Sequence, residues 1–140
     1  MTWLKQNWFC NMAPRWVKSV LDDRSFGVPN GKRFELENIK NVTGGDKLFL
    51  YVNSKSGGII GLFMAVGAVY EDKSELCSNF THRIRFKEKV RLSKPIPFNQ
   101  FGHKIFPNYI NNPGNALRGK SIIPISKQDA EYLECLIVQA

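Results

Sequence analysis

The segment from Thr81 to Leu92 constrains the fold most, because apolar and basic residues alternate over most of its length. A period of two is typical of a β-strand with one face in a core and the other in solvent. Glu88 interrupts the apolar face and indicates a bulge or the exposed end of the strand. The apolar positions are Ile84, Phe86, Val90 and Leu92, and the basic positions are Arg83, Arg85, Lys87, Lys89 and Arg91.

Further strands are predicted on both sides of this segment. They are Asn7 to Met12, Lys47 to Val52, Ile59 to Tyr70 and Ser121 to Ile125, with a hairpin loop over Asn53 to Gly58. Gly61 and Gly67 inside the long strand indicate bulges or a close backbone approach. Because most strands follow one another with short connections, we expect an α+β fold. It is a curled, mostly antiparallel, partly closed β-barrel flanked by short helices.

Two helices are predicted. One begins at Pro14, ends at Asp22 and Asp23, and places Trp16, Val17, Val20 and Leu21 on one face. The other follows Ser126, which resembles an N-terminal cap, and buries Ala130, Leu133, Leu136 and Ile137. Residues 26–32 are expected to be loop, 95–113 irregular, and Glu35 and Glu37 solvated surface. Without a repeat or linker, residues 1–140 are expected to form one domain.

The charge balance favours a polyanionic partner. The chain has 20 Lys and Arg against 12 Asp and Glu, a net charge of +8. The alternative is a charge that only maintains solubility. The three cysteines, Cys10, Cys77 and Cys135, are widely spaced and form no C-x-x-C motif. This pattern predicts reduced thiols and no zinc site. The apolar stretch from Ile59 to Tyr70 is too short to cross a bilayer, and we expect a cytoplasmic monomer without a signal peptide.

Catalytic motifs are absent from the sequence. His82 and His103 belong to no metal-binding pattern, and there is no G-x-S-x-G, P-loop or G-x-G-x-x-G segment. Cys10 or Cys77 could meet a histidine in space, but Cys10 lies in an apolar run where a buried thiol is the usual outcome. We therefore predict no catalytic residue, metal or cofactor.

The basic positions of the alternating strand could follow a nucleic-acid backbone. Alternate residues of a strand lie about 6.6 Å apart, which is comparable to the phosphate spacing of a single strand. The alternative is an ordinary solvated face. Aromatic residues beside Gly, Asn or Pro could stack on bases or fill the ends of a barrel. They are Phe26, Phe80, Phe98, Phe101, Phe106 and Tyr109.

A series of short motifs in a fixed order resembles the EVE domain of the PUA-like superfamily, which is related to YTH domains. The resemblance is greatest to small stand-alone archaeal members and covers nearly the whole chain. The motifs are Trp8-Phe9-Cys10, Pro14, Phe26-Gly27-Val28-Pro29, Gly45-Asp46-Lys47-Leu48, Tyr51-Val52, Gly61, Phe80-Thr81-His82-Arg83-Ile84, Gly119-Lys120-Ser121 and Pro124.

This resemblance implies a pocket that takes an extruded, modified base. YTH relatives bind N6-methyladenine, and EVE-type domains are associated with modified bases in DNA or RNA, some beside a partner nuclease or modification system. The family's pocket tryptophan falls on Phe26 here, which keeps an aromatic face but has no N–H donor. The family's K-S-E-P segment falls on Asn11 to Pro14, and its H-S-N segment falls on Val52 to Ser54.

The resulting prediction is a nucleic-acid-binding module rather than an enzyme. The residues expected in the base pocket are Asn11, Met12, Phe26, Gly27, Val28, Asn30, Tyr51, Asn53 and Phe80. The residues expected to contact phosphates are Lys32, Arg33, Arg83, Arg85, Lys87, Arg118 and Lys120. The alternatives are sequence-independent binding through residues 83–91, an enzyme that acts on nucleotides, and a protein-interaction module.

Overall fold

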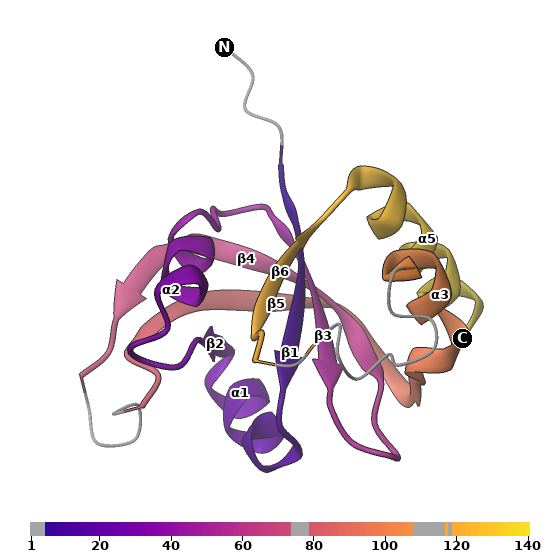
Figure 1. The fold of residues 1–140 in the computed structure, drawn as a ribbon, viewed down its shortest axis with the longest axis horizontal. Coiled ribbons are helices and arrows are strands. Elements are labelled where there is room, and N and C mark those ends of the chain that lie inside the picture. Colours follow the sequence, from indigo (N-terminus) through magenta and orange to yellow (C-terminus); the bar gives the residue numbers. More distant parts are fainter. Residues whose placement is uncertain (1–4, 74–78, 108–116, 118) are drawn as a thin grey trace.

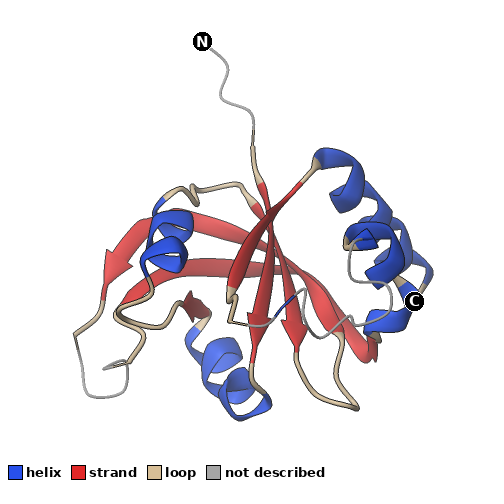
Figure 2. Ribbon diagram, in the orientation of Figure 1, coloured by secondary structure: helices blue, strands red, loops and turns tan. Residues whose placement is uncertain are grey.

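One curled sheet of six strands organises the molecule (Figures 1 and 2). A computed structural model describes residues 5–73, 79–107, 117 and 119–140. The strands lie in the order β2-β5-β4-β3-β1-β6, and only the β1–β3 pair is parallel. Their bounds are β1 Asn7–Met12, β2 Ser25–Gly27, β3 Lys47–Val52, β4 Ile59–Glu71, β5 His82–Ile96 and β6 Ile122–Ile125. This mixed, mostly antiparallel half-barrel confirms the predicted fold class.

Short helices cover the sheet on both sides (Figure 1). The first predicted helix is a 3₁₀ turn, η1 (Pro14–Trp16), continued by α1 (Val17–Asp23), and α2 (Arg33–Lys40) lies on the same side. On the other side lie η3 (Phe98–Gln100), α3 (Gly102–Ile105) and α5 (Lys127–Gln139). The predicted cap of α5 is confirmed, because Ser126 Oγ accepts a hydrogen bond from the Asp129 amide at 3.1 Å. No helix in the described part of the chain is long and apolar enough to cross a membrane.

The sheet separates two hydrophobic cores, and the central strands β1 and β3 contribute to both. Trp8, Cys10 and Leu50 face the first core, under α1 and α2. Phe9 and Tyr51 face the second core, under α3 and α5, where each ring meets another phenylalanine ring edge to face. Because neighbouring side chains of a strand point to opposite faces, a continuous apolar run is the expected signature of strands buried on both faces.

The predicted basic face does not continue along the whole of β5, because the strand is bulged beside Glu88, as the interruption of the pattern indicated. Lys89 is an extra residue in the ladder, since Leu62 pairs with Val90 and Phe63 pairs with Glu88. This bulge reverses the alternation, so Phe86 lies in the first core and Leu92 packs against the second. The predicted role of Gly61 is confirmed, because a Cβ there would collide with the Val90 carbonyl oxygen.

Three local predictions also need correction. The segment 26–32 begins with the end of β2, which pairs with β5 over Ser25 to Gly27. Helix α2 was not predicted, and its Glu35 is buried rather than solvated. The segment expected to be irregular contains the end of β5, η3 and α3, and residues 108–116 lie outside the described part of the chain.

A buried carboxylate joins the beginnings of β1 and β3. Asp46 is fully buried and accepts hydrogen bonds from the Gln6 amide, the Trp8 indole, and the Thr43 amide and hydroxyl, at 2.9 to 3.3 Å. Among the described residues, no basic side chain forms an ion pair with it. Four donors therefore replace the water that this carboxylate loses on folding.

Asp46→Ala should lower the free energy of unfolding by about 3 kcal/mol or more, because four donors would lose their acceptor and some are buried. Urea denaturation followed by tryptophan fluorescence measures this change. Asp22→Ala is the control: its ion pair with Lys18 is on the surface, and its loss should cost less than about 1 kcal/mol. Equal effects of the two substitutions would contradict the role given to Asp46.

Candidate nucleic-acid interface

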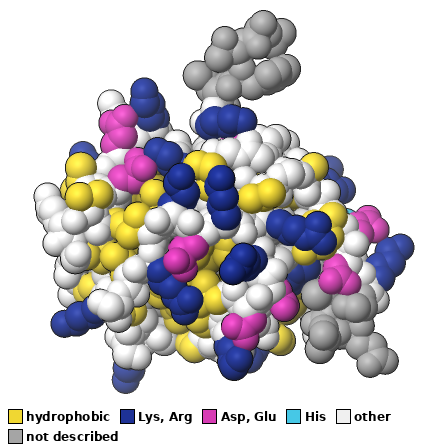
Figure 3. Space-filling view, turned by 180° about the vertical axis from the view of Figure 1, so that it is seen from behind, with side chains coloured by type: hydrophobic (Ala, Val, Ile, Leu, Met, Phe, Trp, Pro, Cys, Tyr) yellow, Lys and Arg dark blue, Asp and Glu magenta, His cyan; other side chains and the backbone are white. Residues whose placement is uncertain are grey.

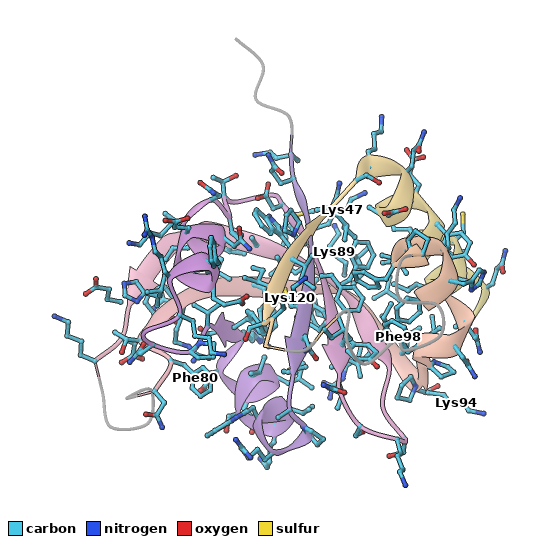
Figure 4. All side chains as sticks on the ribbon, viewed as in Figure 1. Lys47, Phe80, Lys89, Lys94, Phe98 and Lys120 are labelled. Atoms are coloured by element: carbon cyan, nitrogen blue, oxygen red, sulfur yellow. The ribbon has the colours of Figure 1, made fainter. Side chains whose placement is uncertain are left out.

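A cavity in the described surface lies between the two edges of the curled sheet. Its volume is about 880 Å³, within the range of about 300–1,000 Å³ that is usual for small-ligand pockets. Phe26 and Gly27 from edge strand β2 line one side. Lys120 and Ser121, which precede the opposite edge strand β6, line the other. In Figure 4, Phe80 lies beside β2 and α1, and Lys120 lies beside the lower end of β6.

Aromatic rings form one wall of this cavity. Phe26 is 2% exposed and contributes from the first core. Trp16 and Phe80 are half-buried and meet edge to face, with ring centroids 5.2 Å apart. The Arg15 guanidinium lies over the Trp16 ring at 5.3 Å. An edge-to-face pair that lines a cavity is a surface on which a flat, polarisable ring can stack.

The Arg83 guanidinium lies at the cavity and is buried, at 7% exposed. Its Nε donates to Ser25 Oγ at 2.8 Å, its Nη2 to the Ser25 carbonyl at 2.6 Å, and its Nη1 to the Phe80 carbonyl at 3.5 Å. No carboxylate of the described residues forms an ion pair with it. A guanidinium has five N–H donors, so these three bonds leave two donors without an acceptor among the described residues.

Gly27 makes room for this guanidinium. A Cβ built on Gly27 would lie 2.6 Å from Arg83 Nη1 and 3.0 Å from the Phe80 Cβ. Both distances are below van der Waals contact, so any larger residue would displace one of these side chains. The glycine of the family motif is therefore explained here by close packing against Arg83.

Asn11 lines the opposite side of the cavity and holds a buried acceptor there. Its Nδ2 donates to the Leu117 and Lys120 carbonyls at 3.3 and 2.9 Å. Its Oδ1 is buried and has no hydrogen-bond partner in the described structure. A buried acceptor without a partner is costly, and a donor on a bound ligand would remove that cost.

Glu35 fixes the start of β6 and with it the rim of the cavity. Its Oε2 accepts hydrogen bonds from the amides of Ser121 and Ile122, and its side chain is 5% exposed. Lys120 and Ser121 line the cavity, whereas Glu35 does not. The Glu35 carboxylate on α2 therefore positions a wall of the cavity from outside it.

Six of the residues predicted for the base pocket line the cavity: Asn11, Met12, Phe26, Gly27, Asn53 and Phe80. The other three do not. Val28 is buried in the first core, and Asn30 bonds to the amide and hydroxyl of Thr81. Tyr51 lies in the second core, on the opposite face of the sheet. The two-sided burial of β3 was not foreseen and explains the error for Tyr51.

The residues predicted to contact phosphates are dispersed. Lys32, Arg83 and Lys120 line the cavity, but Arg83 is buried in it. Arg33 is exposed and forms an ion pair with Glu37 at 3.2 Å. Arg85 lies over the Tyr70 ring at 4.4 Å, Lys87 is exposed, and Arg118 lies outside the described residues. Acidic side chains lie among the basic ones on the face shown in Figure 3, so the basic residues do not form one continuous track there.

Trp16 is the functional candidate that the sequence did not indicate. Helical spacing placed it in the buried stripe with Val17 and Val20, and only its proximity to Phe80 across 64 residues makes it part of a cavity wall. That contact is between residues far apart in the sequence, so no local pattern could have revealed it. Asp22 and Asp23 also line the cavity, at the end of α1.

A thiol nucleophile is disfavoured at the one predicted cysteine that the structure describes. Cys10 is fully buried in the first core, and burial raises the pKa of its thiol far above the ordinary value. The thiol therefore stays protonated at neutral pH. Cys77 lies outside the described residues. No group of three or more His, Cys, Asp or Glu side chains in the described part could hold a metal ion.

The comparisons with known proteins identify the class of the chain. Residues 6–136 match the EVE domain family, so the protein belongs to that family. No curated protein sequence matches it significantly.

Solved structures share the fold at low sequence identity. A hypothetical protein from Leishmania major has a TM-score of 0.73 at 16% identity, covering 97% of this chain and 96% of that one. The human THYN1 protein in complex with DNA containing 5-methylcytosine has a TM-score of 0.67 at 16% identity, with coverages of 94% and 97%. The Toxoplasma CPSF4-YTH domain has a TM-score of 0.65 at 12% identity, with coverages of 99% and 90%. At such identities the likeness establishes the fold alone, and a YTH domain is among the structures that share this fold.

Glu35→Ala should accelerate hydrogen exchange at the Ser121 and Ile122 amides, because both lose their shared acceptor. The loss of hydrogen bonds to a charged group predicts an increase of about 10- to 100-fold, measured by NMR. Glu37→Ala, which removes only an exposed partner of Arg33, should leave both rates unchanged. Unchanged exchange in the Glu35 variant would show that the rim is held by other contacts.

Proposed function

We propose that this protein binds DNA or RNA by taking one extruded base, preferentially a modified one, into the cavity between β2 and β6. The observation that carries the proposal is the combination of an aromatic wall with unsatisfied hydrogen-bond donors and an unsatisfied acceptor. Trp16 and Phe80 supply the wall, Arg83 supplies spare donors, and Asn11 Oδ1 supplies a free acceptor. An extruded base needs a stacking surface and groups that read its edge.

Each element has a distinct task in this proposal. The aromatic rings stack on the base, and the apolar side chains of Met12, Val20 and Phe26 offer a place for an added methyl group. Arg83 donates to oxygen or nitrogen acceptors of the base, and Asn11 Oδ1 accepts from an exocyclic amino group. A cytosine edge has groups of both kinds. Lys32 and Lys120 lie exposed at the rim, where phosphates would pass.

The comparisons support the same proposal without extending to these residues. A protein of this fold, human THYN1, has been solved with DNA that contains 5-methylcytosine. The family's pocket tryptophan is Phe26 in this chain, and we propose that Trp16 provides much of the missing aromatic area from a different element. The proposed role is binding without catalysis, and a nuclease or modification enzyme as partner stays a prediction.

Wild-type protein should bind one modified oligonucleotide about 4- to 10-fold more tightly than its unmodified twin, since a buried methyl group contributes about 0.8 kcal/mol or more. Fluorescence anisotropy at one fixed salt concentration can compare cytosine, 5-methylcytosine, adenine and N6-methyladenine at a single position. Trp16→Ala should remove most of the preference, and Trp16→Phe should retain it. Equal affinities for all modified and unmodified oligonucleotides would refute the proposal.

Arg83→Gln should weaken binding about tenfold or more, because a buried, charged donor is lost. If Arg83 reads the base, the slope of log K against log salt should stay the same, whereas Lys32→Gln should reduce that slope by about one. Because Arg83 also donates hydrogen bonds to Ser25, thermal melts should check that the variant is folded. Lys127→Gln on distant α5 is the control for the lost charge. Wild-type affinity of the Arg83 variant would exclude it as a reader of the base.

A further inference from the structure

A second groove adjoins the cavity. It has a volume of about 460 Å³ and lies between α2 and β6, with Phe34 and Asn38 on one side and Pro124 on the other. Asn38 Nδ2 donates to the Ile122 carbonyl at 3.1 Å, so the two elements that border the groove are joined at its base. Lys32, Gly119 and Lys120 line both hollows. The two sites are therefore neighbours across one shared ridge.

Phe34 is unexplained by the packing of its own helix. Helix α2 buries Glu35 and Ile39, whereas Phe34 is 78% exposed. A single exposed apolar residue needs no explanation by itself. This one borders a groove, however, whose lining combines apolar side chains with the basic side chains of Lys32, Arg33 and Lys120.

The charges around the groove favour an anionic occupant. Its acidic residue, Glu35, is buried and committed to the Ser121 and Ile122 amides. The remaining charged side chains of the groove are Lys32, Arg33 and Lys120, all exposed. Lys32 Nζ lies close above Gly119, 4.0 Å from where a Cβ of that residue would be. The ridge between the two hollows is therefore cationic.

We propose that this groove is a subsite for the nucleotide next to the extruded one. The neighbouring base stacks on Phe34, and the phosphate that links the two nucleotides lies on the ridge formed by Lys32, Gly119 and Lys120. An aromatic face beside a positive ridge is the arrangement that single nucleic-acid strands use for stacking and backbone contact. This inference rests on the proposed function, since it takes the first nucleotide to be in the cavity.

The test uses single-stranded oligonucleotides with the preferred base at one position and an abasic site on its 5′ or its 3′ side. With wild-type protein, the abasic site on one side only should weaken binding about tenfold, because stacking of that base is lost. With Phe34→Ala, the intact oligonucleotide should bind about tenfold more weakly, and the abasic site should cost nothing further. Phe34→Trp should restore the difference between the two sides.

Val138→Ala is the matched control, because Val138 is 80% exposed but lies on α5, which packs on the second core on the other side of the sheet. It should bind like the wild type. If Phe34→Ala binds like the wild type, or if an abasic site costs the same in both proteins, the subsite is refuted. Failure of the proposed function has a different signature: no preference for a modified base and no effect of Trp16→Ala.

Discussion

The structure depends on one sheet whose central strands are buried on both faces. β1 and β3 pair in parallel at its centre, and each alternates its side chains between the two cores. Neither strand can shift by one residue, because every large side chain would then enter the wrong core. Variation in such a fold is left to the edges, the loops and the short helices. The candidate site is built from these parts, together with the end of β1 and the beginning of β5.

Two buried carboxylates connect this rigid centre to its surroundings. Asp46 ties the beginnings of β1 and β3 together, and Glu35 ties α2 to the beginning of β6. Both accept hydrogen bonds from N–H groups, and neither forms an ion pair with a described basic residue. Arg83 is the complementary case, a buried cation held by Ser25 and the Phe80 carbonyl. Two of its donors have no acceptor among the described residues, whereas the carboxylates accept hydrogen bonds within the fold.

Features that leave a local pattern in the sequence were predicted, whereas features that depend on contacts between distant segments were missed. The apolar runs of β1, β3 and β4, the glycines in β4 and the cap of α5 all leave local patterns, and each is confirmed. The ordered motifs indicated the family, which the comparison establishes. The burial of Glu35 and Arg83 could not be predicted from a local pattern, because a charged residue on a predicted surface is normally solvated. The pairing of Trp16 with Phe80 depends on how the chain folds back at β2, which no spacing reveals.

The position of the cavity between two sheet edges has a consequence for how members of this architecture can differ. β2 and β6 end the strand order and do not pair with each other. In a closed barrel, the interior width is set by strand number and stagger. Here no ladder hydrogen bond between the two edge strands sets the width of the gap, and these strands are only three and four residues long. The same fold can thus accommodate ligands of different size in different family members while both cores stay intact.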